Sequence, residues 1–567
     1  MLAATWTELE FWRWPITVAY VLLVLLIGVY GLHRYFLVFH WRKHRREIPR
    51  PKRKFEKLPR VTVQLPLFNE GMVAERVIDA TACIEYPEDR LQIQVLDDST
   101  DGSEQVAEQR CAYWRAKGLD IEYTHRTDRT GFKAGALANG LKTATGEFVA
   151  IFDADFVPHT SFLKRTIHFF TDPKIGMVQT RWDHLNRDDS LLTRSQAIFL
   201  DGHFVIEHTA RHRSGRWFNF SGTGGVWRTK AIQEAGGWSH DTLTEDMDLS
   251  YRAQLAGWNF LFLPKVTCPA ELPPEMNAFK SQQHRWTKGS IQVAKKLLPR
   301  LLRSKAPRKI KTEAFFHLTS PLVYLYINLF VLLFYPAIAL NLKGLGASAD
   351  EAAAKPLPGT AGEILATKPM INPPPQDALP VQIVDASSTS ATWLSVLFGL
   401  SLFAMGAMSA SVFYMTSQRI LKRGWWASLA QIPLLMSVGI GIALNNAIAC
   451  VEALIGHQSD FVRTPKYNLV NKTPRNQQEA TAPKAKMMKV IPIPSLKKWT
   501  VVIELAFGLY MLQCTFFAVQ HGWRAAVCIP FLLIFATGYL YVGISSAAVH
   551  IRTWMENRRS ESDLQPV

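Results

Sequence analysis

Long apolar runs constrain the fold of this 567-residue chain more than any other feature of its sequence. The hydrocarbon core of a membrane is about 30 Å thick, which a helix of about 20 apolar residues can cross. The first run is not expected to be a cleaved signal, because Arg13 is the only basic side chain before it and no small-residue cleavage site follows. Runs of sufficient length predict five membrane-spanning helices, over residues 15–37, 318–342, 393–415, 499–520 and 523–544.

A sixth apolar run, residues 425–450, is expected to lie in the membrane interface. It carries Asn445 and Asn446, with Glu452 just beyond, at near-helical spacing, which suits a helix in the interfacial layer. If this run crossed the membrane, the basic segment 454–498 would face the side opposite the other basic loops, against the positive-inside rule. Five spans then place the N-terminus outside and the C-terminus in the cytoplasm.

The formal net charge of +17 is concentrated next to the apolar runs. Lys and Arg crowd residues 41–54, 295–311 and 463–498, where the cytoplasmic surface of a membrane attracts them. We therefore expect anionic membrane lipid, and no nucleic acid, as their partner, with a multi-pass chain in the inner or plasma membrane. Residues 291–303 alternate apolar and basic positions at helical spacing, which predicts an amphipathic helix on that surface.

Residues 58–280, between the first two spans, have the pattern of a soluble α/β domain. Short β-rich runs such as VTVQLPLFN (61–69) and LQIQVLDDS (91–99) are each followed by an amphipathic helical run. Such alternation predicts a parallel sheet with helices on its faces and ligands at the carboxyl ends of the strands. The chain is thus expected to insert an α/β domain into an α-helical multi-pass membrane domain.

Acidic side chains follow two of the predicted strands. Asp97 and Asp98 end one, and Asp153 and Asp155 end another. Asp is common in turns after strands, but a D-x-D pair at a strand end also suits a hard divalent cation that takes phosphate oxygens. Two such clusters at neighbouring strand ends favour a ligand site. Lys133, at the start of a helix of small residues, could reach a phosphate or be a solvated surface lysine.

Two further patterns allow both a structural and a chemical interpretation. Thr244, before Glu245 and Asp246, is expected to cap a helix with its hydroxyl, and Asp246 could also act as a general base. Gln282, Arg285 and Trp286 share one helical face. Arg and Trp often anchor an interfacial helix, but the amide has no role in that interpretation.

Four motifs in register resemble those of a known family. DDS (97–99), DAD (153–155), TED (244–246) and QQHRW (282–286), with spans before and after, resemble the D, D-x-D, T-E-D and Q-x-x-R-W series of membrane-embedded family 2 glycosyltransferases. This group includes cellulose, mannan, hyaluronan and chitin synthases. The similarity covers about residues 58–300, and FNFSGTGGVWR (218–228) is most similar to the mannan and glucan synthase-like branch.

The resemblance implies a Rossmann-like GT-A fold and a role for each motif. Asp246 would be the catalytic base of an inverting transfer, and Asp153 and Asp155 would hold Mg²⁺ or Mn²⁺. Glu245, Gln282, Arg285 and Trp286 would contact the acceptor or the diphosphate. The residues implied to bind the nucleotide sugar are Asn69, Glu70, Asp97, Asp98, Lys133 and Asp153.

SDFVRTPKYN (459–468) resembles the F-x-V-T-x-K gating loop of cellulose synthase. Phe461, Thr464 and Lys466 match that pattern, and Arg463 stands where it has Val. Such a loop has to be cytoplasmic, which agrees with the count of spans.

The resemblance therefore implies a processive synthase that extends a β-glucan from UDP-glucose or a β-mannan from GDP-mannose and extrudes it. The growing glycan would be the acceptor, and a regulatory or translocation partner remains unidentified. A non-processive, ceramide-type lipid glycosyltransferase is the alternative. The expected segments are a first span (1–40), a basic linker (41–57), the catalytic domain (58–280), interface helices (281–312), two spans (313–416) with an external loop (343–391), an interfacial helix (425–453), a cytoplasmic loop and linker (454–498), two spans (499–545) and a cytoplasmic tail (546–567).

Overall fold

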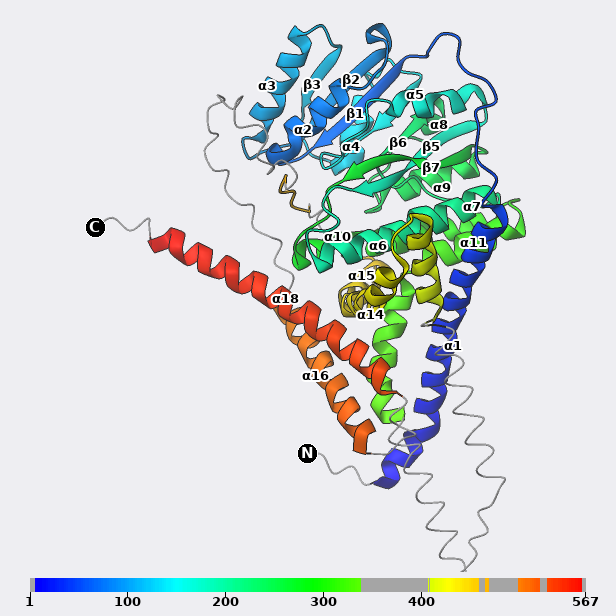
Figure 1. The fold of residues 1–567 in the computed structure, drawn as a ribbon, viewed down its shortest axis with the longest axis vertical. Coiled ribbons are helices and arrows are strands. Elements are labelled where there is room, and N and C mark those ends of the chain that lie inside the picture. The colour runs from blue at the N-terminus through cyan, green and yellow to red at the C-terminus, as the bar shows by residue number, and fades with distance from the viewer. Residues whose placement is uncertain are drawn as a thin grey trace, which may run out of the picture.

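The structure is a computed structural model that describes residues 6–337, 406, 408–457, 464–468, 498–520 and 528–562. An α/β domain lies at one end of the molecule, and the long helices α1 (Trp6–His44), α16 (Lys498–Gln520) and α18 (Ile529–Ser562) extend from the other (Figure 1). Helix α10 (Met276–Arg303) lies between the two parts. This arrangement agrees with a soluble domain inserted among apolar helices.

The α/β domain is built on one seven-stranded mixed sheet of order β3-β2-β1-β4-β6-β5-β7. The first four strands match the predicted β-rich runs and pair in parallel. The expectation of an all-parallel sheet is wrong at β6, which runs antiparallel to both β4 and β5. The strands are β1 (Val61–Leu67), β2 (Leu91–Asp97), β3 (Ile121–His125), β4 (Phe148–Ile151), β5 (Ile175–His184), β6 (Gly225–Arg228) and β7 (Asn259–Ala270).

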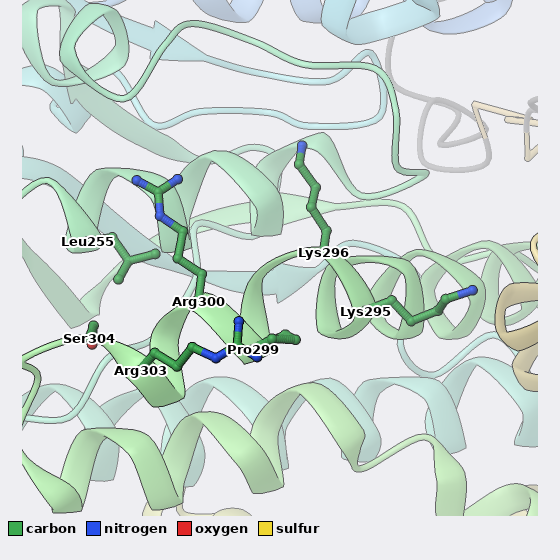
Figure 2. A pocket seen from close by; sticks show the side chains of 7 residues that line it. All are labelled: Leu255, Lys295, Lys296, Pro299, Arg300, Arg303 and Ser304. Carbon is green, nitrogen blue, oxygen red and sulfur yellow. The ribbon is translucent and has the colours of Figure 1, made fainter.

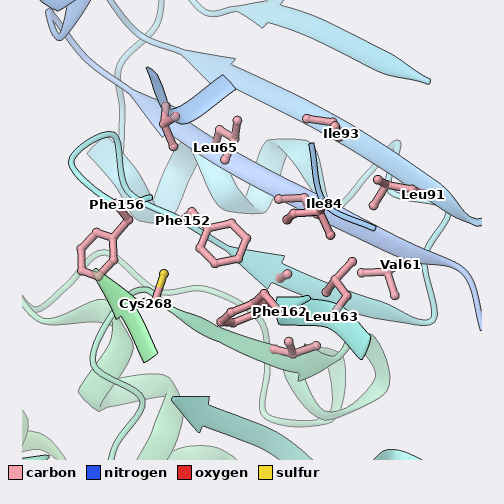
Figure 3. Close-up of a cluster of buried hydrophobic side chains, with 14 of the residues drawn as sticks. Val61, Leu65, Ile84, Leu91, Ile93, Phe152, Phe156, Phe162, Leu163 and Cys268 are labelled. Carbon is pink, nitrogen blue, oxygen red and sulfur yellow. The ribbon is translucent and has the colours of Figure 1, made fainter. Parts of the chain in front are cut away.

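Helices cover both faces of this sheet, and alternating strand residues divide its core in two. Val63 and Phe152 belong to the cluster on one face, where the rings of Phe152 and Phe162 pack edge to face (Figure 3). Val149 and Trp227 belong to the cluster on the other face. The remaining elements of the domain are α2 (Gly71–Ala82), η1 (Glu88–Arg90), α3 (Ser103–Ala116), α4 (Phe132–Gly140), α5 (Phe162–Thr166), η2 (Ile167–Thr171), α6 (Leu191–Asp201), the π-helix η3 (Gly202–His208), α7 (Thr209–Arg213), α8 (Thr229–Glu234) and α9 (Glu245–Leu255).

Four helices of the described part are long and apolar enough to cross a membrane, or five if a bent pair is one span. That pair, α11 (Arg308–Thr319) and Leu322–Ala337, bends by 55° and covers the described part of the second predicted span. The predicted first, fourth and fifth spans correspond to α1, α16 and α18. Of the predicted span 393–415, only residue 406 and residues 408–415 lie within the described residues.

The stretch predicted to lie in the interface is also among the four candidates by length and composition. It consists of α14 (Trp425–Gly441) and α15 (Ala443–Ile455), which meet at Ile442. In the most apolar 18-residue stretch of this region, 72% is buried inside the protein, compared with 17% in that of α1. This burial is due in part to α10, which packs along α15.

The apolar side of helix α10 packs against other helices of the protein. Of the four apolar positions expected on one side of an amphipathic surface helix, Ile291, Ala294 and Leu301 are buried, and Leu298 is half-buried. Ala294, Leu297 and Leu301 pack in one cluster with Tyr251 of α9 and residues of α11. The periodicity therefore reflects a core contact, and the basic side of the helix is left exposed.

A buried ion pair joins α10 to the long helices. Lys280 Nζ lies 2.6 Å from Glu504 Oε1 of α16, and both side chains are fully buried. The same ammonium lies 3.3 Å from Ser546 Oγ of α18. Breaking a buried pair strands a charge and costs about 3–5 kcal/mol, so this contact holds the helix of the QQHRW motif against α16 and α18.

Candidate active site

The carboxylates at the carboxyl end of β2 are bound by groups of the neighbouring strand and loops. Asp97 accepts hydrogen bonds from Ser99 N (2.9 Å) and from the Tyr123 hydroxyl (3.0 Å), and burial raises its pKa. Asp98 accepts two bonds from the guanidinium of Arg126, at 2.8 and 2.6 Å. Asp97 and Asp98 are therefore already hydrogen-bonded to groups at this edge of the sheet. Any contact with a nucleotide would be made in addition to these bonds.

The predicted residues after β1 form the adjacent loop. Asn69 has a left-handed φ of 53°, and its side-chain oxygen accepts a bond from Thr100 N at 2.8 Å. The backbone N–H of Asn69 donates to Ser99 Oγ, also at 2.8 Å. Glu70 is the N-cap residue of α2 and is half-buried. The ends of β1 and β2 are thus joined into one rigid rim.

Two lysines neutralise the D-x-D pair. Lys133 Nζ lies 2.5 Å from Asp153 Oδ1, and Lys466 Nζ lies 2.5 Å from Asp155 Oδ2. Lys133 also donates to Gly222 O at 2.9 Å, and the surrounding carboxylates raise its pKa against the opposing effect of burial. Lys133 is therefore paired beside the D-x-D motif and is not a solvated surface lysine.

The donor set at this pair fits Mg²⁺ or Mn²⁺. Among the described residues, no group of three or more His, Cys, Asp or Glu side chains could hold a metal ion. Mg²⁺ is typically bound by one or two carboxylates together with substrate phosphates and water. Asp153 and Asp155 would supply those carboxylates, and a diphosphate the remaining oxygen ligands.

Asp246 lies in the first turn of α9, facing Lys133 across a glycine. A Cβ at Gly222, whose φ is +82°, would lie 3.1 Å from Asp246 Oδ2 and 3.5 Å from Lys133 Nζ. Desolvation, with the neighbouring charge of Glu245, raises the pKa of Asp246 to about 7, although Lys133 opposes the shift. A carboxyl with this pKa changes its protonation near neutrality, as a general base should.

Thr244 is the N-cap residue of α9, as predicted, but the predicted capping by its hydroxyl is wrong. Its side chain makes no capping hydrogen bond, and its hydroxyl is buried without a partner among the described residues. The residue instead packs against α10, where a Cβ at Gly289 would lie 2.5 Å from Thr244 Cγ2. Close approach at Gly289 therefore brings the TED and QQHRW motifs together.

Arg285 lies close to the carboxylates of the TED and D-x-D motifs. Burial lowers its pKa, while the charges of Glu245, Asp153 and Asp246 act in the opposite direction. Gln282 is half-buried on the same helix, three residues earlier. The planar guanidinium could bind a diphosphate with two parallel hydrogen bonds.

Trp286 lies next to a second indole that sequence reasoning missed. Its ring centre is 6.4 Å from that of Trp182, at the end of β5. Trp182 Nε1 donates to Thr223 O at 3.3 Å, and Thr223 Oγ1 accepts a bond from Asp153 N at 2.9 Å. The two indoles therefore form an aromatic wall beside the D-x-D pair. The only signal in the sequence is a tryptophan near the end of a short β-rich segment, IGMVQTRWDH (175–184).

Part of the predicted gating loop contacts the same edge of the sheet. Besides Lys466, Tyr467 N donates to Glu271 Oε1 at 3.2 Å, and Arg76 Nη1 donates to Asn468 Oδ1 at 3.0 Å. Thr464 is buried. Phe461 lies outside the described residues. Residues 464–468 are thus on the α/β side of the molecule, although α15 and α16 flank them in the sequence.

Residues 59–289 match the family described as "Glycosyltransferase like family 2". The chain contains a family 2 glycosyltransferase domain. Glucomannan 4-beta-mannosyltransferase 2 of Arabidopsis thaliana is 46% identical over 255 residues, 44% of this chain and 48% of that protein. Glucomannan 4-beta-mannosyltransferase 1 of Oryza sativa subsp. japonica is 45% identical over 252 residues, 44% of this chain and 48% of that protein. The chain thus spans about half the length of these relatives.

These matches confirm the resemblance of the family 2 domain to the cellulose synthase-like group and the expected GT-A class of fold. Among solved structures, one described as "Mannosyltransferase PcManGT from Pyrobaculum calidifontis in complex with GDP-Man and Mn2+" is 21% identical. The match covers 72% of this chain and 100% of that one, with a TM-score of 0.44.

The family 2 domain therefore gathers its four motifs at one edge of the sheet. A carboxyl with a pKa near 7, an arginine, a lysine and a D-x-D pair converge beside two indoles. Such a set can hold a diphosphate, take a proton from a hydroxyl and offer an apolar surface to a ring.

Proposed function

We propose that this chain is an inverting hexosyltransferase that transfers mannose from GDP-mannose to the end of a β-linked glycan. The observation that carries this proposal is the convergence of Asp246, Lys133 and Arg285 beside the D-x-D pair. The names of the relatives favour a mannosyl donor over the UDP-glucose that the sequence also allowed.

Asp246 is the base in this mechanism. It would accept the proton of the acceptor hydroxyl as that oxygen attacks the anomeric carbon on the face opposite the diphosphate. One displacement inverts the configuration, and the bond to the nucleoside diphosphate breaks as the glycosidic bond forms. Its raised pKa lets Asp246 take a proton near neutral pH and still be ionised before the attack.

The cationic side chains would stabilise the departing diphosphate. Lys133 and Arg285 lie at the D-x-D edge, where negative charge grows as the bond to the sugar breaks. A divalent cation, Mg²⁺ or Mn²⁺, held by Asp153 and Asp155 would supply Lewis-acid stabilisation of the same charge. Asn69, Glu70, Asp97 and Asp98 would border the nucleoside at the joined ends of β1 and β2.

Trp286 and Trp182 would hold the acceptor. Apolar faces of a sugar ring pack on indoles, and Gln282 and Glu245 would bond its hydroxyls. We further propose that the enzyme is processive, works at the cytoplasmic face of the cell membrane and passes its product between the apolar helices. The buried contact of Lys280 with Glu504 supports this route, because it joins the acceptor helix directly to α16.

A lipid glycosyltransferase is the less favoured alternative, because the similar relatives bear the names of polysaccharide-forming enzymes. The lipid partner that we propose is the anionic membrane surface. A regulator or translocation partner would be a separate protein.

The test supplies purified full-length protein with labelled GDP-mannose or UDP-glucose and a manno-oligosaccharide acceptor. We expect label from GDP-mannose in a product that a β-mannanase digests. Asp246→Asn should lower the rate by about 10²–10⁴-fold, whereas the matched exposed variant Asp188→Asn should not. A product with a single sugar on a lipid, or full activity of Asp246→Asn, would contradict the proposal.

A further inference from the structure

A basic groove lies on the exposed side of α10, away from the D-x-D pair. Its volume is about 640 Å³, and Figure 2 shows four long cationic side chains around it. Leu255, the last residue of α9, and Pro299 provide its apolar lining. The complete lining is Leu255, Lys295, Lys296, Pro299, Arg300, Arg303 and Ser304.

Two of the four cations are held by the protein. Lys295 donates to the carbonyl oxygens of Ala453 and Leu454, at 3.0 and 2.8 Å, and so ties α10 to the end of α15. Lys296 forms ion pairs of 2.8 Å with both Asp241 and Asp248. These contacts fix both lysines, and the two acids offset the charge of Lys296.

The two arginines of the groove differ from these lysines. Neither Arg300 nor Arg303 has a hydrogen bond or ion pair within the part of the chain that the structure describes, and both are exposed. They are three residues apart on one helix, so their side chains lie on the same face. The helix C-terminus accounts for some preference for cations at this point, but not for a groove between them.

We propose that this groove binds a ligand that carries a phosphate group, through the guanidinium groups of Arg300 and Arg303. Planar guanidinium groups match phosphate oxygens with paired hydrogen bonds, and Lys295 adds positive charge nearby. Leu255 and Pro299 would pack against the carbon skeleton that bears the phosphate.

The site joins the two helices that carry the catalytic motifs. Leu255 ends the helix that starts beside Asp246, and the arginines lie on the helix that carries Trp286. A ligand in the groove would therefore hold the ends of α9 and α10 together. Binding at this site does not depend on the proposed glycosyl transfer.

The phosphate group has two candidate sources. A phospholipid headgroup could enter from the membrane, since Leu302 is 44% exposed and α11 follows into a candidate span. A free phosphorylated compound could enter from solution. Both present the same group to the arginines, so the experiment has one arm for each source.

Purified full-length protein serves for both arms. In detergent, binding of labelled inorganic pyrophosphate is measured by equilibrium dialysis without divalent metal. In nanodiscs, native mass spectrometry counts the lipids retained from phosphatidylglycerol or phosphatidylcholine. The variant is R300Q/R303Q, with K305Q/R308Q as control, because it removes the same charge from exposed positions outside the groove. R300K/R303K keeps the charge but loses the paired donors.

We expect R300Q/R303Q to weaken binding by about tenfold or more in at least one arm, R300K/R303K to weaken it partly, and the control to match the unmodified protein. Loss in the nanodisc arm alone identifies a lipid headgroup, and loss in the dialysis arm identifies a soluble ligand. Equal binding by all variants, or an equal loss in the control, would overturn the proposal.

Discussion

Lys466 Nζ lies 2.5 Å from Asp155 Oδ2, although 311 residues separate the two in the chain. The ammonium thus contacts a carboxylate that we propose as a metal ligand. Lysine and a divalent cation would compete for the same oxygen, since both neutralise the same charge. The position of residues 464–468 therefore indicates whether the D-x-D pair is free to bind metal.

The first prediction follows from this competition. Lys466→Met should increase the affinity for Mn²⁺ in the absence of nucleotide by about threefold to tenfold, because it removes the competing charge. Electron paramagnetic resonance of free Mn²⁺ measures this directly. Lys164→Met is the control, since it removes an ammonium from the exposed pair with Glu85 on the same domain. An unchanged or weaker Mn²⁺ affinity would show that the two cations do not share a site.

The pH dependence of the rate provides a second prediction. The pKa of Asp246 is raised to about 7, so the carboxylate needed to accept a proton is lost as the pH falls through that value. We expect kcat/KM to fall about tenfold for each pH unit below the pKa and to reach a plateau above it. Glu245 contributes to the raised pKa, so Glu245→Gln should move the midpoint to lower pH. A profile that is flat from pH 5 to 8 would exclude Asp246 as the base.

A third prediction concerns the space between Asp246 and Lys133. Gly222→Ala would place a Cβ 3.1 Å from Asp246 Oδ2 at a φ of +82°. Gly237→Ala is a matched control, because its φ is +74° and no heavy atom of the described residues lies within 4 Å of an added Cβ. Both variants should lose about 1–2 kcal/mol of stability to backbone strain, as thermal unfolding would show.

Only Gly222→Ala should also lose activity, by about tenfold or more, because the methyl group displaces the base from its position. Similar rates for the two variants would mean that the glycine is required for its backbone conformation alone.

The sequence allowed prediction of the features that depend on local pattern. The first four strands follow from β-rich runs that alternate with helical ones. The four motifs drew attention to the acids and to Arg285, which the fold brings near one another. The roles of Asp97 and Asp98 within the rim depend on Tyr123 and Arg126, which a reading of single motifs cannot place beside them.

Features that depend on distant contacts could not be predicted in this way. Strand β6 has only four residues after a glycine-rich segment, so nothing local indicates its antiparallel pairing. The Thr244 hydroxyl does not cap α9, and the close approach of this residue to Gly289 of another helix could not be predicted from the local motif. The apolar positions of α10 have the period of any amphipathic helix, and only the fold shows that α9 and α11, rather than lipid, cover them.

The aromatic wall leads to the last prediction. If Trp286 and Trp182 hold the acceptor, Trp286→Ala should raise the KM for a manno-oligosaccharide by about tenfold and leave the KM for GDP-mannose nearly unchanged. Trp286→Phe keeps a smaller aromatic face and should recover part of the affinity. Trp426→Ala is the control, since that indole is 77% exposed and belongs to α14. A rise in both KM values would instead place Trp286 at the donor, because the change would then alter the site around the diphosphate.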